Sequence, residues 1–174
     1  MNDDQKKIYC FDSSAFISLN RAEKIIPIPD LWPELENYMN QGVIISHEIV
    51  YEELNPNSEN ADSLGKWIKN KKRFFLEVTQ KQIDLVSDII DKFSTLIDAE
   101  KEKDEADPWI IALAKEKSDE ITLFGKNIFI YVVSQEKITS PKRIPAVCRY
   151  LGIPHMNLED FFIDVGWSFG LIKK

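Results

Sequence analysis

The chain of 174 residues contains few of the residues from which the most recognisable catalytic centres are built. Its two histidines, His47 and His155, stand in neither a catalytic-triad nor a zinc-site spacing, so we expect both to be ordinary surface or partly buried residues. No glycine-rich phosphate loop is present, which disfavours a nucleotide kinase or an ATPase. The two cysteines, Cys10 and Cys148, lie far apart in apolar contexts. This pattern predicts buried, reduced thiols in a reducing compartment.

Long apolar runs and an excess of positive charge are also missing. No segment approaches the roughly 20 apolar residues that cross a bilayer, and the polar start is followed by a run too short for a signal sequence. We therefore expect a cytoplasmic protein that does not bind a membrane. The formal charge of −7 disfavours broad electrostatic binding to nucleic acid. It does not exclude nucleic-acid chemistry, because a cluster of metal-binding acids contributes to the same negative sum.

The length and the apolar content of 44% are sufficient for one domain, residues 1–174, with a core of its own. Strand-like and helix-like segments alternate, which predicts an α/β fold with a mainly parallel sheet. Strands are expected at residues 8–12, 43–45, 74–78, 121–133 (with a possible hairpin turn at 125–127) and 155–156. Helices are expected at residues 14–22, 30–41 (capped by Asp30), 46–54 (capped by Ser46), 59–70, 80–98, from Asp107-Pro108 onward, 145–151 (closed by Gly152) and 157–164.

Asp12 is the acidic residue whose position is most informative. It ends the apolar run Ile8–Phe11 and precedes a helix start with two serines, Ser13 and Ser14. The carboxyl ends of parallel strands are where open α/β sheets place their chemistry. If other carboxylates gather at the same edge, they can form a metal site.

Three further acids are candidates, and each has an alternative explanation. Glu53 falls within the apolar stripe of its expected helix, where a carboxylate is costly unless it is paired or bound to a metal, although a helix-end side chain can also reach water. Asp107 precedes Pro108, and a role as a helix N-cap would by itself explain an acid at this position. Glu136 could be an ordinary loop acid, and Glu102, Asp104 and Glu105 belong to a charge run that we expect to be solvated.

These segments together resemble the PIN-domain superfamily, and in particular an uncharacterised bacterial and archaeal branch similar to the ribonuclease toxins of toxin–antitoxin pairs. The four motifs that carry the resemblance are, in chain order, Tyr9–Ser14, Ile45–Leu54, Ala106–Ala114 and Val133–Glu136. The closing segments Ile144–Ile153 and Asn157–Phe161 resemble that branch as well. The fourth motif carries Glu136, whereas many PIN domains carry Asp there.

The resemblance implies a PIN-like three-layer α/β/α sandwich around a mainly parallel sheet of four to five strands. It also implies a metal-dependent ribonuclease in which Asp12, Glu53, Asp107 and Glu136 hold one or two Mg²⁺ or Mn²⁺ ions. Such ions prefer oxygen ligands, and they activate water for hydrolysis of a phosphodiester. Asp12, Glu53 and Asp107 are then expected to converge on a shared cation, with Ser13, Ser14 or Ser134 supporting the carboxylates. Capping or turn formation explains the serines equally well.

The remaining expectations concern partners. The densest basic segment contains Lys66, Lys69, Lys71, Lys72 and Arg73 around Trp67, and it could contact phosphates and bases. A solvated helix end with Trp67 in the core is the plainer interpretation. Lys137, Lys142 and Arg143 lie nearer the fourth motif and could equally approach the substrate. RNA is the expected substrate. A cognate antitoxin and a homodimer are possible partners by resemblance alone.

Two other functions compete with the nuclease. The first is a catalytically weak PIN-like module that binds RNA or protein. The second is a phosphatase with Asp12 as nucleophile, which the sequence disfavours because the usual second Asp, two residues on, is Ser14.

Overall fold

A computed structural model describes residues 6–25, 28, 30–54, 56–93, 106–123, 127–136, 139 and 143–167. Its centre is a five-stranded parallel sheet with the order β3-β2-β1-β4-β5. The strands are β1 (Lys6–Phe11), β2 (Ile44–His47), β3 (Phe75–Leu76), β4 (Ile128–Val133) and β5 (His155–Met156). The predicted sheet is therefore confirmed, and all its pairings are parallel.

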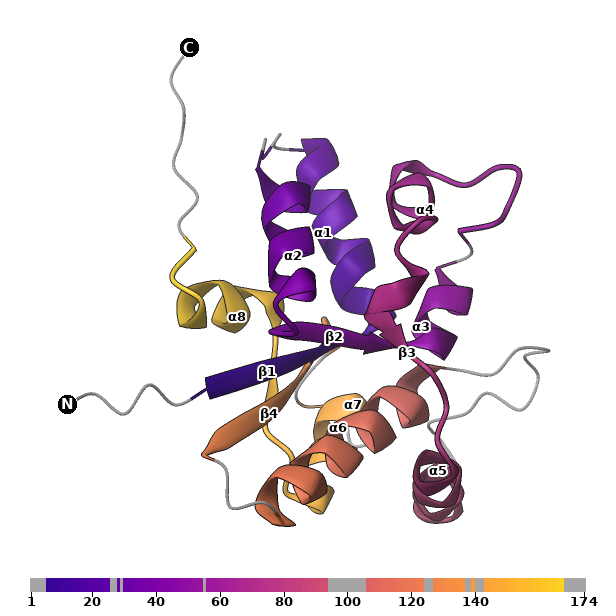
Figure 1. Ribbon diagram of the computed structural model, residues 1–174, viewed down its shortest axis with the longest axis vertical. Coiled ribbons are helices and arrows are strands. Elements are labelled where there is room, and N and C mark those ends of the chain that lie inside the picture. The colour runs from indigo at the N-terminus through magenta and orange to yellow at the C-terminus, as the bar shows by residue number, and fades with distance from the viewer. Residues whose placement is uncertain are drawn as a thin grey trace.

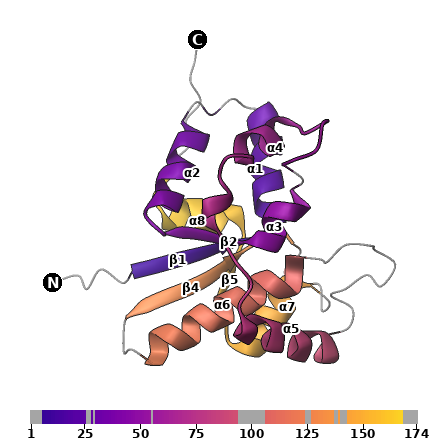
Figure 2. The same cartoon turned by 45° about the vertical axis from the view of Figure 1, so that its right-hand side comes forward.

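Helices cover both faces of this sheet, which gives the predicted three-layer α/β/α sandwich (Figures 1 and 2). One layer contains α1 (Ser13–Ile25), α2 (Leu31–Asn40), α4 (Ser63–Ile68) and α8 (Leu158–Asp164). The opposite layer contains α5 (Gln80–Lys92), α6 (Ala106–Leu123) and α7 (Ile144–Leu151). The short α3 (Glu48–Glu53) directly follows β2, and the 3-10 turn η1 (Lys72–Phe74) leads into β3.

Helix α6 is the central helix of its layer, as its sequence predicts. Residues Ile110–Ala114 are all buried, and the helix packs against β1, β2 and β4 as well as α3, α5 and α7. A helix that is apolar nearly all round is stable only in such a position. Among the described helices, none is long and apolar enough to cross a membrane.

Two boundaries differ from the prediction in an informative way. Residues 121–123 continue α6, and β4 begins only at Ile128, so the expected strand 121–133 was too long. Ile121 and Thr122 are β-branched and have strand-like character, but the helix preceding them extends through them. The expected turn at 125–127 lies mostly outside the described residues. Helix α3 begins at Glu48 because His47, not Ser46, is its N-cap: Nδ1 of His47 accepts the Ile49 amide at 3.1 Å.

The remaining local predictions are mostly confirmed. Gly152 ends α7 with a φ of +70°, a left-handed conformation that glycine adopts without strain. Asp30 occupies the N-cap position of α2, although its side chain makes no capping bond. Helix α4 is shorter than the expected 59–70, because Asp62 caps it. Cys10 and Cys148 are both buried free thiols.

Candidate metal centre at the carboxyl edge of the sheet

Asp12 lies where β1 and β4 end side by side. Phe11 pairs with Val133, the last residue of β4, and the Asp12 amide donates to the Val133 carbonyl at 3.0 Å. Asp12 is only 2% exposed. Its Oδ2 accepts the Ser14 amide at 3.0 Å and the Ser14 hydroxyl at 2.6 Å. Its Oδ1 is buried and has no hydrogen-bond partner among the described residues.

This environment shifts Asp12 toward its protonated form in the absence of a cation. Burial raises the pKa of the Asp12 carboxyl, the two hydrogen bonds from Ser14 act against that shift, and the nearby charge of Glu136 adds to it. A buried carboxylate with one unpartnered oxygen is costly in free energy. A cation at Oδ1 would remove that cost, so the residue fits the role of metal ligand.

Ser14 joins Asp12 to the loop after β4. The same hydroxyl that donates to Asp12 accepts the Gln135 amide at 3.0 Å. Gln135 in turn accepts the Leu158 amide through Oε1 at 3.2 Å, at the start of α8. The expected support of a carboxylate by a serine is therefore present for Ser14. Ser13 is buried beside it. Ser134 is buried and pairs instead with Nε2 of His155 at 2.9 Å.

Glu136 lies in the same loop, but its carboxylate already has two partners. Oε2 accepts the Ile144 amide at 2.7 Å at the start of α7, and Oε1 forms an ion pair with Arg143 at 3.1 Å. An acid at a helix N-terminus is favourable, so Glu136 stabilises α7. It remains close enough to Asp12 to influence its pKa. Arg143, a possible substrate contact in the sequence, is bound to Glu136 here.

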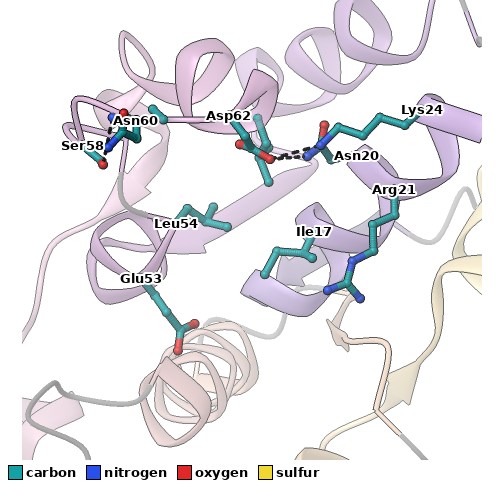
Figure 3. A pocket seen from close by; sticks show the side chains of 11 residues that line it. Ile17, Asn20, Arg21, Lys24, Glu53, Leu54, Ser58, Asn60 and Asp62 are labelled. Atoms are coloured by element: carbon teal, nitrogen blue, oxygen red, sulfur yellow. Dashed lines mark hydrogen bonds and ion pairs between the residues drawn. The ribbon is translucent and has the colours of Figure 1, made fainter.

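Glu53 and Asp107 come from two helices that contact each other, α3 and α6. Glu53 is the last residue of α3, and it is exposed, so the expectation of an inward-facing side chain was wrong. Its carboxylate points toward the helix below α3 (Figure 3). Asp107 is half-buried in the first turn of α6, which begins at Ala106. It therefore lies inside the helix and not at the capping position.

Topology brings the four acids toward one edge of the sheet. Asp12 and Glu136 follow β1 and β4, and Glu53 ends the helix after β2. Helix α6 runs back across the sheet to the start of the parallel strand β4, so its first turn, which carries Asp107, lies at the same edge. Within the described ranges, however, no three His, Cys, Asp or Glu side chains stand close enough together to hold an ion. Convergence of Asp12, Glu53 and Asp107 on one cation stays a prediction.

The basic segment around Trp67 makes its contacts with α2 instead of with the four candidate metal ligands. Lys71 pairs with Glu36 at 2.9 Å and lies over the Trp67 ring, which packs on Trp32. Arg73 donates to Asn40 at 3.3 Å. Lys66, Lys69 and Lys72 are exposed, and Lys137 and Lys142 lie outside the described residues, as do Glu102, Asp104 and Glu105. The plainer expectation for Trp67, a core contact, agrees with its packing.

A buried polar network was missed by the sequence interpretation. His47 is fully buried, contrary to expectation, and its Nε2 donates to Gln82 Oε1 at 3.1 Å. Gln82 donates to Glu116 of α6 at 2.6 Å, and Thr79 donates to the other oxygen of Glu116 at 2.7 Å. The network fixes the start of α3 against α5 and α6. Glu116 stands in the charged run 115–120, so the sequence gives no signal that this acid alone is buried.

The fold and the acidic edge define a parallel-sheet α/β/α protein with a candidate cation site. Residues 9–169 match the family described as a domain of unknown function (DUF4411), and the chain belongs to this family. A comparison with curated proteins finds no match.

Proposed function

We propose that the protein is a metal-dependent ribonuclease with a PIN-like fold, which hydrolyses phosphodiester bonds at the carboxyl edge of the sheet. The observation that carries this proposal is Asp12: a buried carboxylate at a strand end, with one oxygen held by Ser14 and the other without a partner in the described part of the chain. The four acids suggested by the PIN resemblance all come from segments at this edge. A buried carboxyl whose pKa is shifted by burial and by a nearby charge, as for Asp12, is typical of functional sites.

The donor set fits a hard divalent cation, Mg²⁺ or Mn²⁺, because carboxylate oxygens are the ligands these ions prefer. Asp12 would bind through Oδ1, with Glu53, Asp107 and Glu136 as the further ligands. A bound ion would lower the pKa of a water molecule and offset charge on the phosphate. The side chains themselves supply orientation: Ser14 fixes the Asp12 carboxylate, and the link from Ser14 to Gln135 fixes the loop that carries Glu136.

The PIN resemblance extends the proposal to the protein's role in the cell, its partners and its location. We include a role as the toxin of a type II toxin–antitoxin pair, with a cognate antitoxin, a possible homodimer and a cytoplasmic location.

One observation favours a second candidate, a PIN-like module that binds RNA or protein and is catalytically weak. Both oxygens of Glu136 are occupied by the start of α7 and by Arg143. If Glu136 stays there, the cation has one ligand fewer, and catalysis would be weak.

Cleavage assays separate the two candidates. Wild type, Asp12→Asn and the matched control Asp88→Asn, which alters an exposed acid on α5, are incubated with single-stranded RNA or DNA, with Mg²⁺, Mn²⁺ or a chelator. The nuclease predicts RNA cleavage that needs the ion, survives in Asp88→Asn and is lost in Asp12→Asn. Equal cleavage by all three proteins would exclude Asp12 as a ligand, and RNA binding without cleavage would support the module.

A further inference from the structure

A cleft of about 350 Å³ opens between α1 and the segment that joins α3 to α4 (Figure 3). One wall is a single face of α1, because its lining residues recur at helical spacing: Ile17, Asn20, Arg21 and Lys24. The other wall includes Glu53, Ser58, Asn60 and Asp62. The cleft therefore begins at one of the proposed metal ligands and continues along polar side chains.

The two cations of the cleft differ in their partners. Lys24 pairs with Asp62 at 3.3 Å, and Asn20 donates to the same oxygen of Asp62 at 2.8 Å. The other oxygen of Asp62 accepts the Gly65 amide, so this acid is fully used in the cap of α4. Arg21 is exposed and makes no ion pair or hydrogen bond with any group that the structure describes. Among the described residues that line the cleft, Arg21 is therefore the positive charge that can bind an anion.

The Arg21 side chain also points toward the end of the cleft that lies near Asp12. Its side chain runs back along α1 toward Ile17, and so toward the first turn of the helix, which follows Asp12 (Figure 3). Arg21 lies eight residues after Ser13, which corresponds to about 12 Å along the helix axis. A strand that is cut near Asp12 and lies in the cleft can thus place another phosphate at Arg21.

We infer that this cleft holds single-stranded RNA and that Arg21 binds one of its phosphates; the inference rests on the proposed ribonuclease function. The fork of N–H groups on a guanidinium matches a phosphate. Asn60 and Ser58, on the opposite wall (Figure 3), supply hydrogen-bonding groups for sugar or base edges. A cleft at the small end of ligand-pocket volumes admits part of one strand but not a duplex.

Binding without cleavage tests this inference. A short fluorescein-labelled single-stranded RNA is titrated with protein in chelator, at several salt concentrations, and followed by fluorescence anisotropy. Arg21→Gln is expected to weaken binding about tenfold and to reduce the salt slope by about 0.7, the value for one phosphate contact on a single strand. Arg21→Lys should recover part of both, and a duplex of the same sequence should bind more weakly than the single strand.

Two control variants define the outcomes. Arg149→Gln removes the same charge from an exposed site on α7, and Lys69→Gln tests the rival basic segment near Trp67. Cleft binding predicts that both resemble wild type. The inference is wrong if Arg21→Gln binds RNA with the same affinity as Arg149→Gln, or if Lys69→Gln loses more affinity than Arg21→Gln. If wild type still cleaves RNA in either case, the proposed function stands. If wild type neither binds nor cleaves RNA, both are wrong.

Discussion

The Ser14 hydroxyl donates to Oδ2 of Asp12 at 2.6 Å and, from the same oxygen atom, accepts the Gln135 amide at 3.0 Å. One small side chain thus sets the orientation of the buried acid and ties the helix after β1 to the loop after β4. Oδ1 of Asp12 is left as the atom available to a ligand. The following predictions test this arrangement and its neighbours.

Ser14→Ala should lower cleavage of RNA by about 10- to 100-fold, the usual cost of removing a group that orients a ligand. Loss of both hydrogen bonds from the Ser14 hydroxyl should also cost about 1–3 kcal/mol of stability. Cleavage rates and urea denaturation measure the two effects. Ser87→Ala, on the exposed face of α5, is the control and should change neither. Full activity in Ser14→Ala would show that Asp12 needs no orienting partner.

Asp12→Asn should stabilise the protein in chelator by about 1 kcal/mol or more, because it removes a buried charge. The pKa of Asp12 is raised in the folded state. Between the unfolded value near 3.9 and the folded value, the folded chain keeps a proton that the unfolded chain has lost, so stability falls as pH rises through that window.

The measurement is the free energy of unfolding of wild type and Asp12→Asn as a function of pH in chelator. Stability of the variant minus that of wild type should grow with pH across this window and then level off. A variant that is less stable at every pH would contradict the proposed cost of the buried carboxylate.

Arg143→Gln should release Glu136 toward the cation site. Arg143 has a side chain that is 60% exposed, so its ion pair contributes little stability, about 0–1 kcal/mol. The melting temperature should therefore hardly change, and the affinity for Mn²⁺ should rise by a few-fold as Glu136 loses its competing charge. Calorimetric titration gives the affinity. Unchanged Mn²⁺ binding would indicate that Glu136 acts only at the start of α7.

Two histidines should make the fold sensitive to acid. Burial lowers the pKa of His155 to about 4, and burial likewise lowers the pKa of His47. Unfolded histidines titrate near 6.5, so their contribution is intact above that pH and is lost as pH falls from 6.5 toward 4. Protonation of His47 would also remove the acceptor that caps α3.

Urea denaturation from pH 7 to pH 4 measures this loss of stability. His155→Gln and His47→Gln should each reduce the dependence on pH in that range. A pH dependence equal to that of wild type in both variants would show that other groups cause it.

Much of the fold could be predicted from the sequence because its signals are local. Short apolar runs ending in a polar residue mark β1 and β4, and the apolar helix α6 has only one stable location. The end of α6 could not be predicted, since the β-branched Ile121 and Thr122 carry strand propensity that the preceding packed helix overrides. Periodicity also failed for Glu53: α3 has six residues, and the last of them has no following turn to bury it.

The site was only partly predictable for a related reason. Asp12 and Ser14 are neighbours in sequence, so their contact follows from a helix start. The capping of α7 by Glu136 and the network from His47 to Glu116 join distant segments. The cleft at Arg21 likewise depends on how α1 approaches the segment before α4, which no local pattern encodes.

Titration with Mn²⁺, followed by calorimetry and by the loss of the free-ion electron paramagnetic resonance signal, tests most directly whether Asp12 is a cation ligand. Wild type and Asp88→Asn should bind Mn²⁺ with the same affinity, and Asp12→Asn should bind at least tenfold more weakly, about 1.4 kcal/mol. Equal Mn²⁺ binding by Asp12→Asn and wild type, or no binding by wild type, would contradict the proposed metal centre.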